Sequence, residues 1–201
     1  MMLTELDPLA DAALPVAEFR DHLKLGTGFA DADAQDGALG AYLRAALAAI
    51  EGRIGKALIA RRFRWRIAAW RAPDAQPLPL APVSEILALE TVDRDGTVVA
   101  VPPGRFVLVP DFQRPKIAAT GAALPAIPTE GTAQIEFRAG FGAAWTDVPV
   151  DLRQAVLMLA ARYYEGRHEG ALQAGGTALP FGVLALIERW RTVRVLGGGR
   201  T

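Results

Sequence analysis

The hydrophobic pattern of the chain changes its period twice, and this change limits the folds it can adopt more than any other feature. Apolar side chains recur at helical spacing up to Ile54. Between Arg62 and Ile67 they alternate one for one with arginines, which is typical of a half-buried strand with a basic outer face. Helical spacing returns after Pro149. This order indicates an α+β fold in which a block of strands is inserted into a helical domain.

About four helices are predicted. They cover residues 15–25, 36–54, the stretch from Pro149 to Tyr163, and 180–193. The longest helix ends before Gly55, a residue that suits a helix C-terminus. Its apolar stripe is formed by Leu39, Leu43, Leu47, Ile50 and Ile54.

The strands between the helices are predicted to be short and antiparallel. Ten of the 14 prolines lie within residues 73–148, which suits short strands joined by irregular loops. Asp95-Gly96 is a strong hairpin signal. The predicted strands are residues 62–67, 84–92, 97–101, 105–109, 116–119 and 132–139.

Three regions follow from these elements. Residues 1–58 would form an N-terminal arm and the first helices of the helical domain. Residues 59–147 would form the inserted β-rich region. Residues 148–201 would supply the last helices and a flexible tail, with a glycine-rich linker over residues 166–177.

The charges of the chain cancel as a whole but not locally. Twenty-two basic residues face 22 acidic ones, so a strongly basic nucleic-acid binder is not expected. Residues 1–36 hold 2 basic and 8 acidic residues, whereas residues 37–72 hold 8 and 1. Residues 73–160 are again acidic and residues 161–201 basic. Such segmentation suits a subunit that meets copies of itself and its neighbours through complementary faces.

The residues that usually carry catalysis are scarce. There is no cysteine, Ser84 is the sole serine, and His22 and His168 are the two histidines. His168 lies between Glu165 and Glu169, where a solvated helix end explains it better than a metal site. No phosphate-binding or nucleophile-elbow motif is present. We therefore expect no enzyme activity, no cofactor and no metal, although a cleft that gathers carboxylates around His168 would indicate an enzyme.

No secretory signal or membrane-spanning stretch is recognisable in the sequence. The N-terminus lacks a basic region followed by a long apolar one. The longest apolar runs fall far short of the roughly 20 residues that a membrane helix needs. We expect a soluble protein that is made in the cytoplasm and has no membrane partner.

The arginine-rich stretch from Arg61 to Arg71 allows two interpretations. With Phe63, Trp65 and Trp70 it could form a basic and aromatic surface that binds nucleic acid. Strict alternation instead places the aromatic residues in the core and leaves the arginines for solvent or an acidic protein partner, which favours the second interpretation. The candidate subunit-interface residues are Arg61, Arg62, Arg64 and Arg66.

The last predicted helix also allows two interpretations. Its apolar side chains, together with nearby arginines, could pack onto the protein's own core or dock in a groove on another subunit. Tryptophan and arginine are frequent anchors of such interfaces. The candidate docking residues are Leu184, Ile187, Trp190, Arg191 and Arg194.

Four segments, taken in order, resemble the head–tail connector (adaptor) proteins of long-tailed phages and of phage-like gene transfer agents. They are Leu43–Gly55 (LRAALAAIEGRIG), Leu78–Ile86 (LPLAPVSEI), Ile135–Gly142 (IEFRAGFG) and Val148–Arg167 (VPVDLRQAVLMLAARYYEGR). The resemblance implies a structural protein that forms a ring, usually of twelve copies, beneath the portal of a phage-like particle. One side would dock on the portal and the other would receive the stopper or tail, while packaged DNA passes through the channel without sequence-specific binding. By analogy, the last helix is the candidate for portal docking.

Overall fold

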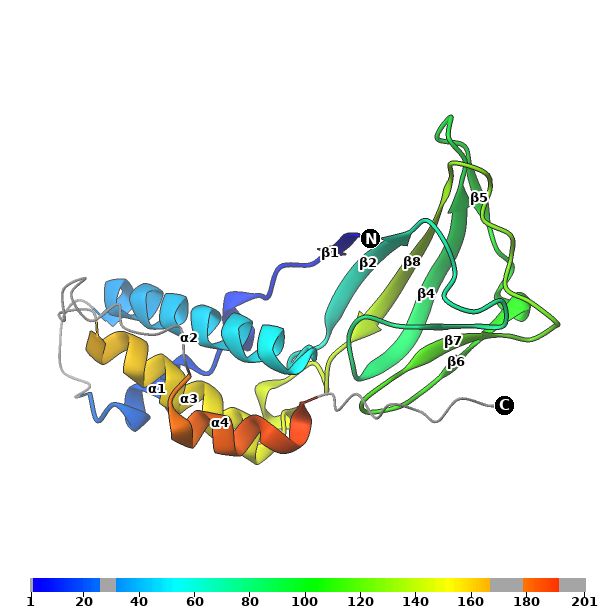
Figure 1. The fold of residues 1–201 in the computed structure, drawn as a ribbon. Coiled ribbons are helices and arrows are strands. Elements are labelled where there is room, and N and C mark those ends of the chain that lie inside the picture. Colours follow the sequence, from blue (N-terminus) through cyan, green and yellow to red (C-terminus); the bar gives the residue numbers. More distant parts are fainter. Residues whose placement is uncertain (1, 26–31, 167–178, 192–201) are drawn as a thin grey trace.

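Helices and strands occupy opposite ends of an elongated molecule (Figure 1). The computed structural model describes residues 2–25, 32–166 and 179–191. At the helical end, α2 packs against α3, and α1 and α4 lie along this pair. Short 3-10 turns precede α1, α3 and strand β6, and one extends α4 through Trp190. The helices are α1 (Val16–His22), α2 (Ala32–Ile54), α3 (Val150–Glu165) and α4 (Phe181–Ile187).

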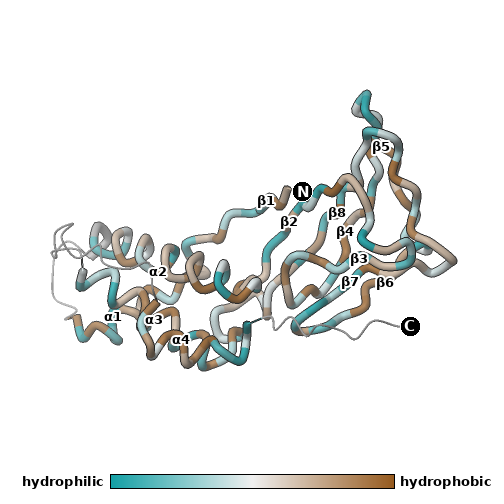
Figure 2. Tube along the Cα trace, viewed as in Figure 1, coloured by the Kyte–Doolittle hydropathy of each residue, from teal (hydrophilic) through white to brown (hydrophobic). Residues whose placement is uncertain are grey.

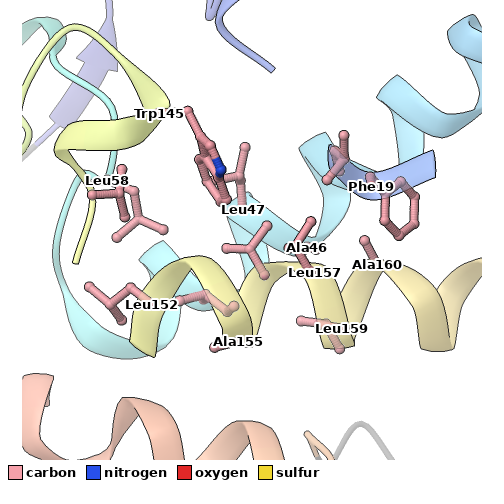
Figure 3. Close-up of a cluster of buried hydrophobic side chains, with 14 of the residues drawn as sticks. Phe19, Ala46, Leu47, Leu58, Trp145, Leu152, Ala155, Leu157, Leu159 and Ala160 are labelled. Atoms are coloured by element: carbon pink, nitrogen blue, oxygen red, sulfur yellow. The ribbon is translucent and has the colours of Figure 1, made fainter. Parts of the chain in front are cut away.

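The helical core is a cluster of aliphatic side chains between α2 and α3 (Figure 3). The predicted stripe of α2 is buried along its whole length, from Leu39 to Ile54. Phe19 of α1 closes the cluster at one end. Trp145 lies at its border, where its indole Nε1 donates a hydrogen bond to Glu18 at 2.8 Å. The periodicity of the sequence therefore identified this core correctly.

The strands form two antiparallel sheets. The larger sheet has the order β1-β2-β8-β4-β5, and the smaller has the order β3-β7-β6. Their side chains share a second core, in which the rings of Phe63 and Phe137 stack with centroids 5.9 Å apart and Ile117 is fully buried. The strands are β1 (Met2–Glu5), β2 (Arg61–Ile67), β3 (Ala75–Pro77), β4 (Val83–Val92), β5 (Val98–Ala100), β6 (Phe106–Val109), β7 (Lys116–Ala119) and β8 (Thr132–Ala139).

The α+β class and all six predicted strands are confirmed, but two further strands were missed. β1 consists of residues that we read as an arm of the helical domain, and it pairs with β2 at the edge of the larger sheet. β3 lies in a segment that we read as a proline-rich loop; it is an edge strand, where Pro77 is tolerated. The last helix is shorter than predicted, because α4 ends at Ile187 and a 3-10 turn follows. The linker and tail predicted to be flexible lie outside the described residues, and the domain boundaries stay a prediction.

The two ends of the molecule are joined where three chain segments cross. After α2, Gly55 adopts a φ of 68°, which turns the chain toward β2. Ala57 N then donates to Ala81 O at 3.1 Å. Phe141 N donates to Leu58 O at 3.1 Å, and Ala60 N donates to Gly142 O at 2.7 Å. We call residues 55–60, 81–82 and 140–142 the crossing. Each of its segments comes from, or directly follows, a motif that carried the family resemblance.

Gly140 is required at the crossing for two reasons. Its φ of 139° is strained for any residue with a side chain. A Cβ at this position would also lie 2.3 Å from the Cα of Ala60, which is backbone and cannot swing away.

We expect Gly140→Ala to lower the free energy of unfolding by about 2–5 kcal/mol, through backbone strain and overpacking together. Gly121→Ala is the matched control, since a Cβ there meets nothing within 4 Å. Urea denaturation followed by circular dichroism measures both. Equal midpoints for the two variants would show that the crossing does not depend on this glycine.

Candidate assembly interface

The arginines of β2 lie on two different sides of the larger sheet. Arg62, Arg64 and Arg66 are on its outer face, while Phe63 and Trp65 point into the core, so the predicted alternation is confirmed. Arg61 has the same strand parity as the buried aromatic residues. It therefore does not share the outer face with Arg62, Arg64 and Arg66, the other candidate subunit-interface residues.

Each outer arginine is paired with a group on a neighbouring segment. Arg62 donates from Nε and Nη2 to the two carboxylate oxygens of Asp7, at 2.7 and 2.8 Å. Arg64 Nε donates to Glu136 on β8 at 2.8 Å. Bidentate and charge-assisted bonds of this kind fix the arginine side chains in place.

The pairing continues across the sheet through a glutamine. Arg66 Nε donates to Gln134 Oε1 at 2.9 Å, and Gln134 Nε2 donates to Glu90 on β4 at 2.9 Å. Arg138 of β8 lies 3.8 Å from Glu85 of β4. Basic, acidic and amide side chains of β2, β8 and β4 are thus linked across the outer face of the sheet.

This outer face, which we call the charged face, is not a free basic stripe. A surface that binds phosphates needs unpaired lysine or arginine side chains that can replace counterions. Here Arg62 and Arg64 are already matched by the carboxylates of Asp7 and Glu136, and Arg66 is held by the side-chain amide of Gln134. The geometry therefore favours a structural role for these arginines over the nucleic-acid interpretation.

Arg61 links the helical end to the sheet. Its Nη1 and Nη2 donate to the two carboxylate oxygens of Glu51 on α2, at 3.0 and 2.6 Å, and its Nε donates to Glu5 on β1 at 2.8 Å. The side chains of Arg61 and Glu51 are 11% and 13% exposed. Burial opposes the charged form, but Glu51 and Glu5 outweigh it and raise the pKa of Arg61. We infer that Arg61 is a structural link, and its predicted role at a subunit interface stays untested.

The acidic N-terminal arm supplies partners that sequence reasoning missed. Besides Glu5 and Asp7, the arm places Asp11 against Arg44 of α2, whose Nη1 donates to Leu9 O at 2.7 Å. The sequence did contain a signal for this pairing, because the most acidic segment, residues 1–36, directly precedes the most basic one, residues 37–72. Strand β1 was harder to find, since it consists of only four exposed residues.

The candidate docking helix α4 lies against its own chain. Val183 and Ile187 are fully buried in the helical core. Trp190 Nε1 donates to Asp151 of α3 at 2.7 Å, and its ring meets Phe141 edge to face at 5.3 Å. Of the two interpretations that the sequence left open, packing onto the protein's own core is the one seen in this structure.

The other candidate docking residues differ in their exposure and in their bonding partners. Leu184 is partly buried, and Arg191 bonds Glu188 one turn earlier at 3.0 Å. Leu184 lies on α4 and Arg191 directly after the 3-10 turn that extends it, and both are partly exposed, so a partner can reach them. Arg194 lies outside the described residues.

The described part of the chain offers no metal cluster, since no three histidine or carboxylate side chains are grouped there. Glu165 is exposed at the end of α3, while His168 and Glu169 lie outside the described residues. None of the described helices combines the length and hydrophobicity needed to cross a membrane.

The ion pair between Asp7 and Arg62 predicts a pH-dependent contribution to stability. The hydrogen bond from Arg62 lowers the pKa of Asp7 below its ordinary value of 3.8. The pair therefore stabilises the fold above that pH, and its contribution is lost as the pH falls through the lowered pKa. We expect Asp7→Asn to lower the melting temperature at pH 7 and to leave it unchanged once Asp7 is protonated in both states.

Thermal denaturation at several pH values between 7 and 3 measures this effect. Arg62→Gln should remove the same contribution, so the double variant should melt no lower than either single variant. A gap between wild type and Asp7→Asn that did not close at low pH would contradict the pairing.

Comparison with known proteins gives a consistent result. No family model and no curated protein matches the chain. Among solved structures, a chain from the neck of an empty gene transfer agent particle, computed with C6 symmetry, is 61% identical with a TM-score of 0.88. A chain from the virion of a native gene transfer agent particle is also 61% identical, with a TM-score of 0.85.

A third chain, from the neck of a native gene transfer agent particle computed with C12 symmetry, is 56% identical with a TM-score of 0.83. Each alignment covers 98% of this protein and 99% of the other chain. The likeness therefore extends over the arm, the sheets and the helices together. The protein belongs to the phage-like head–tail connector family.

Proposed function

We propose that this protein is a structural component of the neck of a phage-like particle, where twelve copies form a ring beneath the portal. The observation that carries the proposal is the 56% identity, over 98% of the chain, to a neck protein in a structure with C12 symmetry. The ring would join the capsid to the stopper or tail. Packaged DNA would pass through its channel without sequence-specific binding.

The physical character of the described surface supports a structural role. The charged face balances its own charges, and Arg61 holds the sheet to α2 through an almost fully buried ion pair. Such pairs fix geometry, because breaking one leaves an uncompensated buried charge. A connector needs a fixed shape of this kind more than it needs a reactive group.

The ring is tested by imaging particles assembled with this protein. We expect twelve copies between portal and tail in electron-microscopy reconstructions computed without imposed symmetry. Particles that carried the protein elsewhere, or in a different copy number, would contradict the corresponding part of the proposal.

Portal docking is proposed for the exposed side of α4. Leu184 lies at this surface and Arg191 follows the 3-10 turn that extends α4, whereas Ile187 is buried and could contact a partner only if α4 left α3. Docking through the exposed side requires no such separation. Trp190 would then act by fixing α4 on α3 through its bond to Asp151.

We expect truncation after Gly176 to abolish binding to the portal protein. This truncation also uncovers α3, so Leu184→Ser/Arg191→Glu is the sharper variant, because it leaves Val183 and Ile187 in place. We expect the double variant to bind at least about tenfold more weakly, equivalent to roughly 1.4 kcal/mol. Ala185→Ser, an exposed position on the same helix, is the control. If the truncated protein bound as tightly as the full chain, the docking assignment would be wrong.

The alternative function, nucleic-acid binding through residues 61–71, predicts a different result. Because the arginines of β2 are paired, we expect no measurable affinity for duplex DNA in fluorescence anisotropy at low salt. Affinity that fell steeply with salt, and that Arg64→Gln weakened, would favour the alternative. Glu188→Gln, a change at a distant exposed ion pair, serves as the control.

A further inference from the structure

The outer face of the smaller sheet differs from the charged face, because it is largely apolar. On β6, Phe106 and Leu108 turn toward the core, while Val107 and Val109 are 48% and 37% exposed. Figure 2 shows β6 as a continuously hydrophobic strand. The residue opposite Val107 on β7 is Ala118, and the only charged side chain in this register is Lys116. β6 is also the edge of its sheet, with no partner strand on its outer side among the described residues.

The loop that follows β6 adds a large aromatic residue to this surface. Phe112 is 68% exposed. The loop around it is anchored nonetheless, because Asp111 Oδ1 accepts hydrogen bonds from the backbone N–H groups of Gln113 and Arg114, at 2.6 and 2.7 Å. An aromatic side chain held out on a fixed loop can dock with little loss of conformational freedom. We call Val107, Val109 and Phe112 the β6 surface.

A buried lysine explains why this loop is fixed. Lys56, at the crossing, is fully buried, and its ammonium donates to Phe112 O and to Gln113 Oε1, the latter at 3.1 Å. Burial lowers the pKa of Lys56, so its position has a cost that the hydrogen bonds to the loop offset. The position of Phe112 is thereby tied to the crossing that holds the two ends of the molecule together.

A second exposed apolar edge lies elsewhere on the β end. β5 is the last strand of the larger sheet, and Val98 and Val99 are 54% and 59% exposed. Their side chains point to opposite faces of the sheet, Val98 to the side of Val92 and Val99 to the side of buried Thr91. We call the exposed strand edge that carries these two valines the β5 surface. Figure 1 shows β5 and β6 at different places on the β end, and they are edge strands of different sheets. An exposed sheet edge with apolar side chains is a liability in a monomer and normally has a partner or a cover.

The charges around the two surfaces are opposite. Exposed Arg105 precedes β6, and exposed Lys116 is opposite Val109. Beside the β5 surface, the hairpin turn carries Asp93, Arg94 and Asp95, a net charge of −1. Around the β6 surface the basic side chains outnumber the acidic one, Asp111. An apolar strip with a net basic rim and an apolar strand edge beside a net acidic turn are complementary in charge and in hydrophobicity.

We propose that the β6 surface of one copy packs against the β5 surface of the next copy, and that this contact closes the ring. The inference rests on the proposed function, because it takes its occupant, a second copy, from the ring symmetry of the neck structures. A ring requires a heterologous interface, in which two different surfaces of each subunit meet. The two surfaces supply such a pair.

Cysteine cross-linking tests this contact, because the natural chain has no cysteine. In assembled particles, the variant with both Val99→Cys and Val107→Cys should give a ladder of disulfide-linked species under oxidising conditions. Either single variant should give no such product, since a heterologous contact does not bring identical positions together. The control is Ala45→Cys with Val99→Cys, in which the second cysteine lies on the exposed side of α2.

The outcomes separate this inference from the proposed function. Electron microscopy of the same particles shows whether rings are present. Rings without the ladder would overturn the proposed contact and leave the ring intact, whereas absence of rings would overturn the function itself. A cross-link between Val107→Cys and Val195→Cys within one chain would show that the C-terminal segment covers the β6 surface, and would also overturn the contact.

A substitution provides a second readout. Val107→Ser should reduce incorporation into rings, whereas Val150→Ser, which changes the same residue type at a position that is 71% exposed on α3, should not. Melting temperatures of the purified proteins separate an assembly defect from a folding defect. If Val107→Ser and Val150→Ser were equally stable and were incorporated into rings equally well, the result would contradict a role of the β6 surface in the ring contact.

Discussion

The crossing of three chain segments is the constraint on which the rest of the structure depends. There the chain leaves α2, passes the turn before β4, and meets the end of β8 through backbone hydrogen bonds. Backbone bonds at such close approach leave no room for side chains, which is why Gly140 is required. The same place anchors Lys56, and through it the loop that carries Phe112. The crossing thus fixes the orientation of the two ends and the position of an exposed surface.

Many charged side chains of this protein form ion pairs within the chain that hold its segments in position. The acidic arm and the basic strand β2 lie about 55 residues apart in sequence, yet Asp7 and Arg62 form a bidentate pair. Glu5, Arg61 and Glu51 extend this pairing into the joint with α2. Exposed pairs contribute little stability each, but together they neutralise the face that the composition of β2 had suggested for a partner. The role of Arg62, Arg64 and Arg66 at a subunit interface stays a prediction.

The sequence predicted the fold better than the interfaces, and the reason is physical. Periodicity reports which side chains face a core, so it identified the stripe of α2 and the buried face of β8. The same pattern cannot tell which distant residue will pair with an outward arginine, so the roles of Arg61 and Arg64 were not predictable from β2 alone. β1 and β3 were missed because neither has a strand pattern of its own: all four residues of β1 are exposed, and β3 contains a proline. The motifs that carried the family resemblance meet at the crossing, and they consequently identify the fold rather than the contacts of the ring.

The burial of α4 bears on how a connector can hold partners on two sides. A helix that had to leave α3 in order to dock would expose Val183 and Ile187, at roughly 1.5–3 kcal/mol for each side chain. That cost would be subtracted from the affinity for the portal in every copy. A helix that stays in place, fixed by Trp190 on Asp151, presents Leu184 and Arg191 at no such cost. The same reasoning applies to Phe112 on its anchored loop. In both cases the core of the subunit fixes the position of the surface in advance, which would suit the ring contact and the portal docking that we propose.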